Sequence, residues 1–264
     1  TTEIYTLSLH DALPICSQFM VGFDADVNDM MLAGISFGYS RGYSDAQGRA
    51  DRWRHDVFQM AAYTSLSLQH GIQVDGIASF GVADYDTSRA VTSMSGASFA
   101  TAKPNGEVYV LRTRASRPFS MMGDRLELTP HIGAAYTRVN VDAYQEDGPG
   151  AVHVAGYAHD VTTLDLGVEA QTSFSTRHGV VRPSLQLGAE YALDADDETV
   201  RVTTALGGGF DQIVPAYNEW TGIVGIGATL TNEEKGHAVR FGYEGRFSED
   251  LESHAVTLRG RVRF

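Results

Sequence analysis

The chain has 264 residues, of which 43% are hydrophobic and 20% are charged, and its formal net charge at pH 7 is −13. An acidic balance of this size argues against nucleic-acid binding, which usually requires a basic face. The sequence contains no run of 18 apolar residues, and therefore no candidate transmembrane helix. These observations do not exclude a membrane β-barrel, because apolar and polar residues alternate along barrel strands and keep the mean hydropathy close to that of soluble proteins.

The first residues of the chain have an unusual origin on our interpretation. Thr1–Ile15 resembles, at all fifteen positions, the in-frame translation of a common short-read sequencing adapter, and the codon of Cys16 would straddle the junction. We therefore predict that residues 1–16 are not native and that the native domain occupies residues 17–264. A natural N-terminus is the alternative.

From Ser17 onward, segments with a two-residue period recur, as expected for strands with two different faces. In the last segment Val256, Leu258 and Val262 point to one side, and three arginines point to the other. The segments expected to be strands are Ser17–Asp26, Met31–Tyr43, Arg54–Gln69, Ile72–Tyr85, Gly106–Arg117, Asp124–Val141, Val152–Ser175, Val180–Leu193, Asn218–Thr231, His237–Ser248 and His254–Phe264.

The lengths of these segments indicate a membrane protein. Most have 12 residues or more, whereas globular strands average about five or six and a tilted strand crosses a bilayer in about 9–11. Counted back from the C-terminus, the connections alternate between short and long, and Asp86–Asn105 and Asp194–Tyr217 are expected to be long outer loops. Outer-membrane barrels have short periplasmic turns, so we expect Phe264 on the periplasmic side.

These observations predict an all-β fold, a transmembrane antiparallel up-and-down β-barrel of about 12 strands. Eleven strands are visible, and bacterial single-chain barrels have an even number, so we expect that the first strand is truncated before Ser17. A single alternating strand would also fit a soluble β-sandwich, in which the apolar face points inward. The lengths of the strands disfavour that fold.

Charged residues alternate with the apolar ones and are therefore assigned to the lumen, the interior of the barrel. An arginine facing lipid at the bilayer midplane would cost about 2–4 kcal/mol. Such charges could form a structural network, or a polar lining for a passing polypeptide. The predicted lumen-lining residues are Arg112, Arg114, Arg125, Glu127, Glu169, Arg182, Glu190, Arg240, Glu244, Arg246, Arg259, Arg261 and Arg263.

Catalytic and metal-binding patterns are weak. Gly34–Gly38 matches the G-x-S-x-G pattern of a nucleophile elbow, but that motif needs a strand-to-helix turn and here lies in an alternating strand. The histidines lack the clustering that zinc requires. Asp194–Glu198 is expected to be a solvated loop, with calcium or a lipopolysaccharide-bridged cation as the alternative. We expect no enzyme activity, no metal and no cofactor.

Several segments resemble the C-terminal translocator domain of type V autotransporters: Leu32–Ser40, Gln59–Tyr63, Thr129–Thr137, Gly242–Phe247 and the terminal Phe264. The resemblance runs from about Ser17 to the end. It implies a twelve-stranded barrel in the outer membrane of a Gram-negative bacterium, a helix that threads the lumen, and an N-terminal passenger carried to the cell surface. The passenger, the helix and the first strand would precede Ser17.

The same resemblance implies that Val256, Leu258, Val262 and Phe264 form a signal for the outer-membrane barrel assembly machinery. The expected partners are outer-membrane lipid and lipopolysaccharide, that machinery and the chain's own passenger, around a monomeric barrel. A self-standing porin or adhesin-like barrel is the alternative, and a barrel enzyme is a third hypothesis. A passenger encoded directly upstream of Ser17 would favour translocation, and a signal peptide there would favour a porin.

Overall fold

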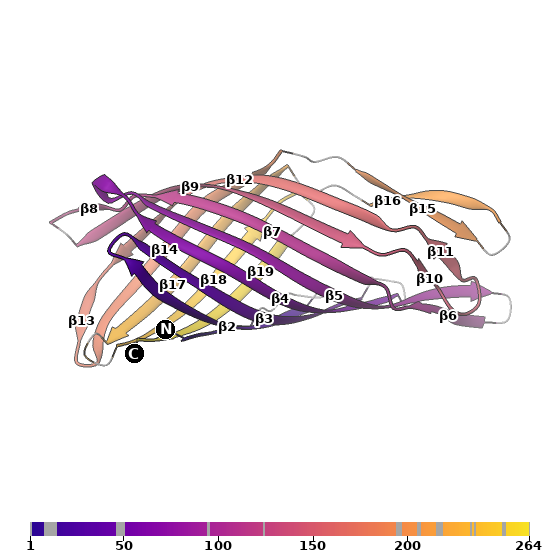
Figure 1. Ribbon diagram of the computed structural model, residues 1–264, viewed down its shortest axis with the longest axis horizontal. Helices are drawn as coiled ribbons and strands as arrows, with labels where there is room; N and C mark the ends of the chain where they lie inside the picture. The colour runs from indigo at the N-terminus through magenta and orange to yellow at the C-terminus, as the bar shows by residue number, and fades with distance from the viewer. Residues whose placement is uncertain are drawn as a thin grey trace.

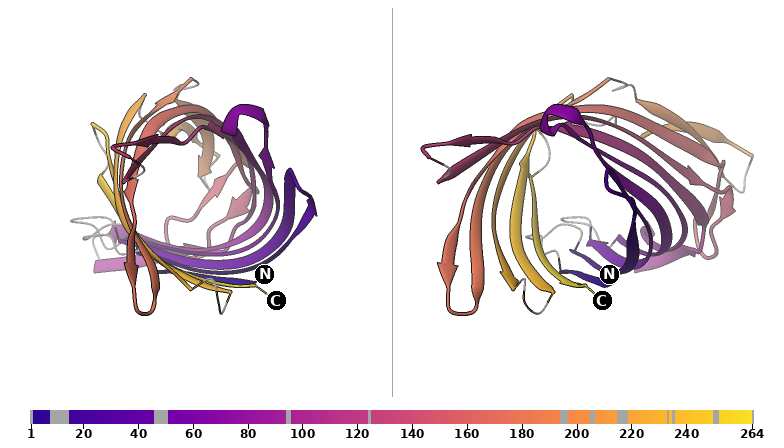
Figure 2. Two further views of the ribbon diagram at one scale, coloured as in Figure 1. Left: turned by 90° about the vertical axis from the view of Figure 1, so that its left-hand side faces the viewer. Right: turned by 60° about the vertical axis from the view of Figure 1, so that its left-hand side comes forward.

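The computed structural model describes residues 2–7, 15–45, 51–93, 96–123, 125–193, 197–204, 207–214, 219–232, 234, 236–249 and 252–263. Antiparallel strands curl into a barrel (Figures 1 and 2), and the only helical element in this part of the chain is the 3-10 turn η1 (Gln69–Gly71). The wall contains eleven long strands: β2 (Ile15–Asn28), β3 (Met31–Asp45), β4 (Arg52–Ser67), β5 (Gln73–Ser93), β7 (Asn105–Ser116), β9 (Leu126–Val141), β12 (Tyr157–Thr172), β14 (Gly179–Ala192), β17 (Trp220–Asn232), β18 (His237–Phe247) and β19 (Glu252–Val262).

Each long strand pairs with the next, from β2 to β19, and a short strand completes the ring. This strand, β1 (Thr2–Leu7), pairs with β2 on one side and with β19 on the other. It has 6 residues, whereas the long strands have 11 to 21, and both of its pairings contain a register shift. The predicted barrel is therefore confirmed, and its seam is the irregular part of the wall.

The two ends of the barrel differ. At the end where both termini lie (Figure 1), neighbouring strands are joined by tight connections, two of which carry the short strands β8 (Phe119–Met121) and β13 (Phe174–Thr176). At the opposite end, β5 extends far beyond the wall and pairs with β6 (Gly96–Ala102). Four short strands form a separate outer sheet there: β10 (Tyr144–Gln145), β11 (Val152–Val154), β15 (Glu198–Thr204) and β16 (Gly209–Val214).

The expectation that Asp86–Asn105 is a loop is wrong, because most of it forms the β5–β6 hairpin. Its Ser-, Thr- and Ala-rich composition is typical of a loop, but the backbones of β5 and β6 pair as antiparallel strands. The connection Asp194–Tyr217 likewise contains β15 and β16. Val200 and Val202 of β15 pack against Val154 of β11 in a small apolar cluster, which accounts for an ordered sheet outside the barrel.

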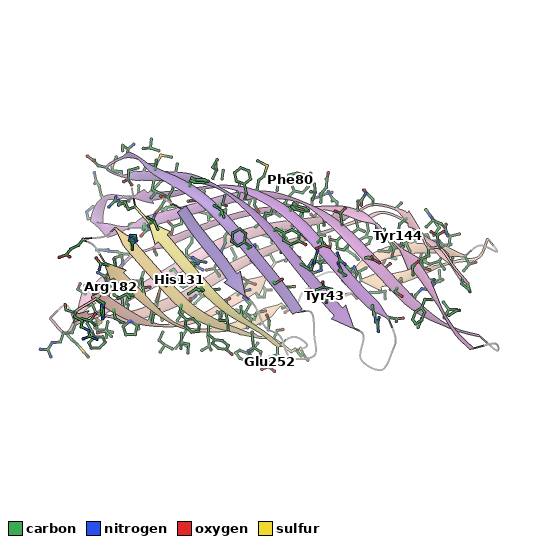
Figure 3. All side chains as sticks on the ribbon, turned by 90° about the horizontal axis from the view of Figure 1, so that it is seen from below. Tyr43, Phe80, His131, Tyr144, Arg182 and Glu252 are labelled. Atoms are coloured by element: carbon green, nitrogen blue, oxygen red, sulfur yellow. The ribbon has the colours of Figure 1, made fainter. Side chains whose placement is uncertain are left out.

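The barrel wall has an apolar exterior and a small or polar interior. On β17, Trp220 and Ile226 are 59% and 55% exposed, whereas the intervening Thr221 and Ile223 are 5% and 6% exposed. Figure 3 shows Phe80 projecting from the outside of the wall. Among the described residues, no large side chain is fully buried. The wall therefore hides its apolar side chains from water only when lipid surrounds it.

The C-terminal strand follows the expected pattern as far as the structure describes it. Leu258 lies on the outer face of β19 and is 58% exposed, on the same face as Val256 and Val262 by strand alternation. Phe264 lies outside the described residues. The described part of the chain includes no helix that is long and apolar enough to cross a membrane.

Candidate functional site

The lumen contains a cluster of charges around Asp165 of β12, whose side chain is 3% exposed. Arg112 and Arg114 of β7 place their Nη2 atoms 3.2 Å from Asp165 Oδ1 and 3.5 Å from Oδ2, respectively. His131 Nε2 of β9 lies 3.7 Å from Oδ2. Two predicted lumen residues therefore meet a carboxylate that was not among the predicted residues.

A glycine makes this cluster possible. Gly133 of β9 lies between Arg114 and Asp165 in the register of the three strands. A Cβ atom at Gly133 would lie 2.4 Å from Asp165 Oδ1, which is far closer than van der Waals contact. The missing side chain thus leaves room for the arginine and the aspartate to meet across the intervening strand.

A second group of charges spans β12, β14 and β18. Arg246 Nη1 lies 3.4 Å from Glu190 Oε1, and Arg246 Nε donates to Glu244 Oε1 at 2.9 Å. Arg240 Nη2 lies 3.2 Å from Glu169 Oε1. These five residues were all predicted to line the lumen, and the structure places them in two separate sets of ion pairs, one around Arg246 and one around Arg240.

A cavity of about 1040 Å³ opens at the lumen mouth, on the side where β19 ends. Asp24 and Asp26 of β2 lie just beyond the described register between β1 and β2, which ends at Thr2 opposite Phe23. Arg261 Nη2 lies 3.2 Å from both carboxylate oxygens of Asp24, and Arg263 Nη2 lies 3.2 Å from Asp26 Oδ2. Arg259 also lines this cavity. The sequence predicted that the three arginines line the lumen, but it did not predict that Arg261 and Arg263 pair with Asp24 and Asp26 of β2.

The remaining predicted residues lie near the same end of the barrel. Arg182 donates to the Thr231 hydroxyl at 3.3 Å, and Figure 3 shows it at the end opposite to Tyr144 of the outer sheet. Arg125 accepts a hydrogen bond from Thr172 at its carbonyl. Glu127 is exposed near the β8–β9 hairpin. These positions are peripheral to the charge clusters.

An aromatic side chain inside the barrel covers a glycine. A Cβ atom at Gly34 of β3 would lie 2.4 Å from Cζ of Tyr63, so the ring occupies the space above that glycine. The Tyr63 hydroxyl donates to Asp24 Oδ2 at 3.2 Å. Tyr63 therefore connects β4 to the charged seam. A sequence pattern shows which face of its strand a residue occupies, but not which residue of another strand it contacts. The Tyr63–Asp24 pair was therefore not predicted.

Aromatic and charged groups also mark the exterior. Ring pairs on the outer wall include Tyr191 with Trp220, at a centroid distance of 4.8 Å, as in the aromatic girdles of membrane barrels. Beyond the wall, Arg89 of the β5 extension donates through Nε to Oε1 of Glu146, which lies between β10 and β11 of the outer sheet, at 3.0 Å. Hydrogen bonding to Glu146, whose side chain is 7% exposed, raises the pKa of the Arg89 guanidinium.

The candidate catalytic and metal patterns have no further support. Gly34–Gly38 lies within the uninterrupted strand β3, with Ser36 buried against the inside of the wall. A nucleophile elbow needs an exposed serine at a sharp turn. In the part of the chain that the structure describes, no three His, Cys, Asp or Glu side chains gather in a metal-binding group. Most of Asp194–Glu198 lies outside the described residues.

Comparisons with known proteins agree with this geometry. The family model "Autotransporter beta-domain" matches residues 17–244. The chain is 23% identical over 186 residues to Esterase EstA of Pseudomonas aeruginosa, and equally to Esterase EstA of Pseudomonas putida; each match covers 68% of this chain and 28% of the relative. The chain thus spans less than a third of the length of these relatives.

Solved structures share the fold. The translocator domain of autotransporter NalP from Neisseria meningitidis matches with a TM-score of 0.76 at 16% identity, covering 100% of this chain and 85% of that one. The beta domain of the Bordetella autotransporter Brka matches with a TM-score of 0.69 at 17% identity, covering 100% and 96%.

Proposed function

Since the chain belongs to the autotransporter β-domain family, whose model matches residues 17–244, we propose that its barrel is an outer-membrane translocator, which anchors an N-terminal passenger and helps to export it to the cell surface. The observation that carries this proposal is a polar, charged lumen inside an apolar wall. A barrel that served only as an anchor would need the apolar wall alone, whereas a translocator also needs a hydrophilic path for a chain.

The direction of the strands supports a path through the lumen. Outer-membrane barrels have short turns in the periplasm and longer connections outside, so the end that carries the tight turns and Val262 is assigned to the periplasm. In the register with β19, Thr2 lies opposite Val262. The first strand of the ring therefore starts on the periplasmic side, and a segment joined ahead of it reaches the surface by passing back through the lumen.

The partners follow from the same assignment. The apolar exterior contacts outer-membrane lipid and lipopolysaccharide. The outer face of β19, with Val256, Leu258 and Val262, together with Phe264, is the signal for the barrel assembly machinery. The charged lumen residues serve as the lining that accommodates the passing polypeptide. Residues 1–16 stay assigned to a sequencing adapter, and their pairing in β1 takes the place of a native first strand.

A protease-accessibility assay tests this function. A signal peptide and an epitope-tagged passenger are fused ahead of Thr1, and intact Gram-negative cells are treated with protease. We expect loss of the tag from intact cells, and protection of the same passenger when β19 is deleted, because the ring then cannot close. A passenger that stays protected, although the full-length barrel is present and heat-modifiable in outer-membrane fractions, would contradict translocation and favour a self-standing porin.

A further inference from the structure

The outer face of β3 changes from apolar to polar along its length. Ile35 and Phe37 are 51% and 52% exposed on this face. Tyr39, Arg41 and Tyr43 continue the same face toward the connection between β3 and β4, because side chains alternate along a strand. A belt of tyrosine and arginine therefore begins where the apolar part of the outer wall ends.

The level of this belt matches the outer surface of a membrane. Ten residues separate Met31, where β3 begins after a tight turn, from Arg41. At about 3.3 Å per residue and a strand tilt of about 40°, they span about 25 Å along the barrel axis, which is also about the height of the apolar band of outer-membrane barrels. Arg54 of β4 lies opposite Tyr43 in the register, and Figure 3 shows Tyr43 well away from the end of the barrel at which Arg182 is found. Both belt arginines therefore reach the depth of the headgroups in the outer leaflet.

Two arginines share one carboxylate in this belt. Arg41 donates through Nε to Asp56 Oδ1 at 2.6 Å, and Arg54 donates through Nε and Nη2 to Asp56 Oδ2 at 3.0 Å and 2.7 Å. The Tyr39 hydroxyl also donates to Asp56 Oδ1. The Asp56 side chain is 16% exposed, whereas those of Arg41 and Arg54 are 39% and 43% exposed. The carboxylate therefore holds two more exposed guanidinium groups next to each other on the outer wall.

The two arginines have donor groups to offer a ligand. In their contacts with described residues, Arg41 donates only through Nε and Arg54 only through Nε and Nη2. The Nη groups of Arg41 and Nη1 of Arg54 can therefore donate to an acceptor that lies over the carboxylate. A planar guanidinium binds a phosphate through two parallel hydrogen bonds, and a phosphate group has enough acceptor oxygens to engage both arginines at once.

The two flanks of the pair differ in charge. On the β5 side, the register places the exposed carboxylates of Asp84 and Asp86 beside the pair. On the β2 side, it places Ser17 and Phe19, neither of which is charged, and both are exposed. An anionic headgroup therefore meets less repulsion on the β2 side. Acyl chains attached to that headgroup would there lie over the exposed rings of Phe19 and Phe37.

We propose that Arg41 and Arg54 form a phosphate-binding site on the outer wall, and that this site binds a phosphate of the lipid A headgroup of lipopolysaccharide. The proposal rests on the proposed function for the placement of the barrel in an outer membrane with the connection between β3 and β4 outside. The outer leaflet of that membrane presents phosphorylated lipid A at the depth of the two arginines. A bound lipid A fastens this part of the rim to the leaflet, and the lumen stays clear for the exported chain.

Native mass spectrometry of the refolded 264-residue chain in detergent micelles tests the proposal, because it counts bound lipids directly. The probe is diphosphoryl lipid A, with EDTA present so that no divalent cation bridges the phosphate to a carboxylate. We expect saturable binding, and about tenfold weaker affinity when R41Q and R54Q are combined, because charge-assisted contacts to the phosphate are lost. The matched control combines R117Q and R177Q, which remove two exposed positive charges beside the tight turns at the opposite end of the barrel, and should leave the affinity unchanged.

A second pair of substitutions separates the phosphate contact from the stability of the fold. R41K combined with R54K keeps both charges beside Asp56 but removes the planar guanidinium groups, so the affinity should fall less than with the glutamine pair. Heat-modifiable mobility verifies that each variant retains a closed barrel. Equal affinity for dephosphorylated lipid A, equal competition by inorganic phosphate at the same phosphate concentration, or an unchanged affinity of the glutamine pair would each overturn the proposal. The binding assay involves no passenger, so translocation can stand in the protease-accessibility assay if this lipid site fails.

Discussion

Replacing Asp165 by alanine gives the sharpest test of the lumen network. The substitution removes the carboxylate that faces Arg112, Arg114 and His131. Two guanidinium groups then lie close together inside the wall without the carboxylate that both of them face. We expect the barrel to remain insertable but to lose stability, because only the weaker electrostatic attraction of Glu244 and Asp75 for Arg114 remains.

The magnitude follows from burial. Removing one partner of a buried ion pair costs about 3–5 kcal/mol. The Asp165 side chain is 3% exposed, but those of Arg112 and Arg114 keep 34% and 33% exposure to the wet lumen. Asp165 Oδ2 also lacks a hydrogen-bond partner among the described residues. We therefore expect a loss of unfolding free energy at the lower end of that range, about 3 kcal/mol.

Equilibrium unfolding in guanidinium chloride, followed by tryptophan fluorescence and heat-modifiable mobility, measures the effect. Asp160→Ala is the matched control, since Asp160 binds Arg138 on the outer wall with 45% of its side chain exposed. An exposed pair contributes about 0–1 kcal/mol. Equal losses for the two variants would refute the reasoning, because they would show that water screens the Asp165 cluster as fully as an exterior pair.

Three further outcomes are expected. Gly34→Val should lower the midpoint temperature of heat modification of the purified barrel, because the valine Cβ would lie 2.4 Å from Tyr63 Cζ and displace the ring. In the control variant Gly76→Ala the new Cβ would lie 3.5 Å from the nearest atom, so this variant should have little effect. Glu146→Gln should speed proteolysis of the outer sheet, measured on intact cells, by weakening its ion pair with β5, and unchanged cleavage would contradict this. Deleting Phe264 should reduce the heat-modifiable barrel in outer-membrane fractions without reducing synthesis, and an unchanged amount would remove the proposed assembly signal.

The wall was predictable from the sequence because two-residue alternation and strand length are local properties. Leu258 and Arg259 indicate opposite faces whatever strand lies beside them. The alternation of tight and long connections also follows from the chain alone, so the barrel fold could be predicted.

The contacts within the lumen could not be predicted in this way. Whether Arg114 meets Asp165 depends on the stagger between β7, β9 and β12, and a barrel sets that stagger through its closure as a whole. The β5–β6 hairpin was missed for a related reason: Thr, Ser and Ala are frequent in loops, and their pairing in this extension depends on a partner strand rather than on their own preferences.

The outer sheet has a consequence for how this protein can vary. Its strands come from two different connections, β10 and β11 from the one between β9 and β12, and β15 and β16 from the one between β14 and β17, and the β11–β15 pairing joins them. An insertion or deletion in one connection must therefore be matched in the other, because otherwise the register between β11 and β15 changes. Engineers who display foreign peptides on this barrel should treat both connections as one exchangeable module.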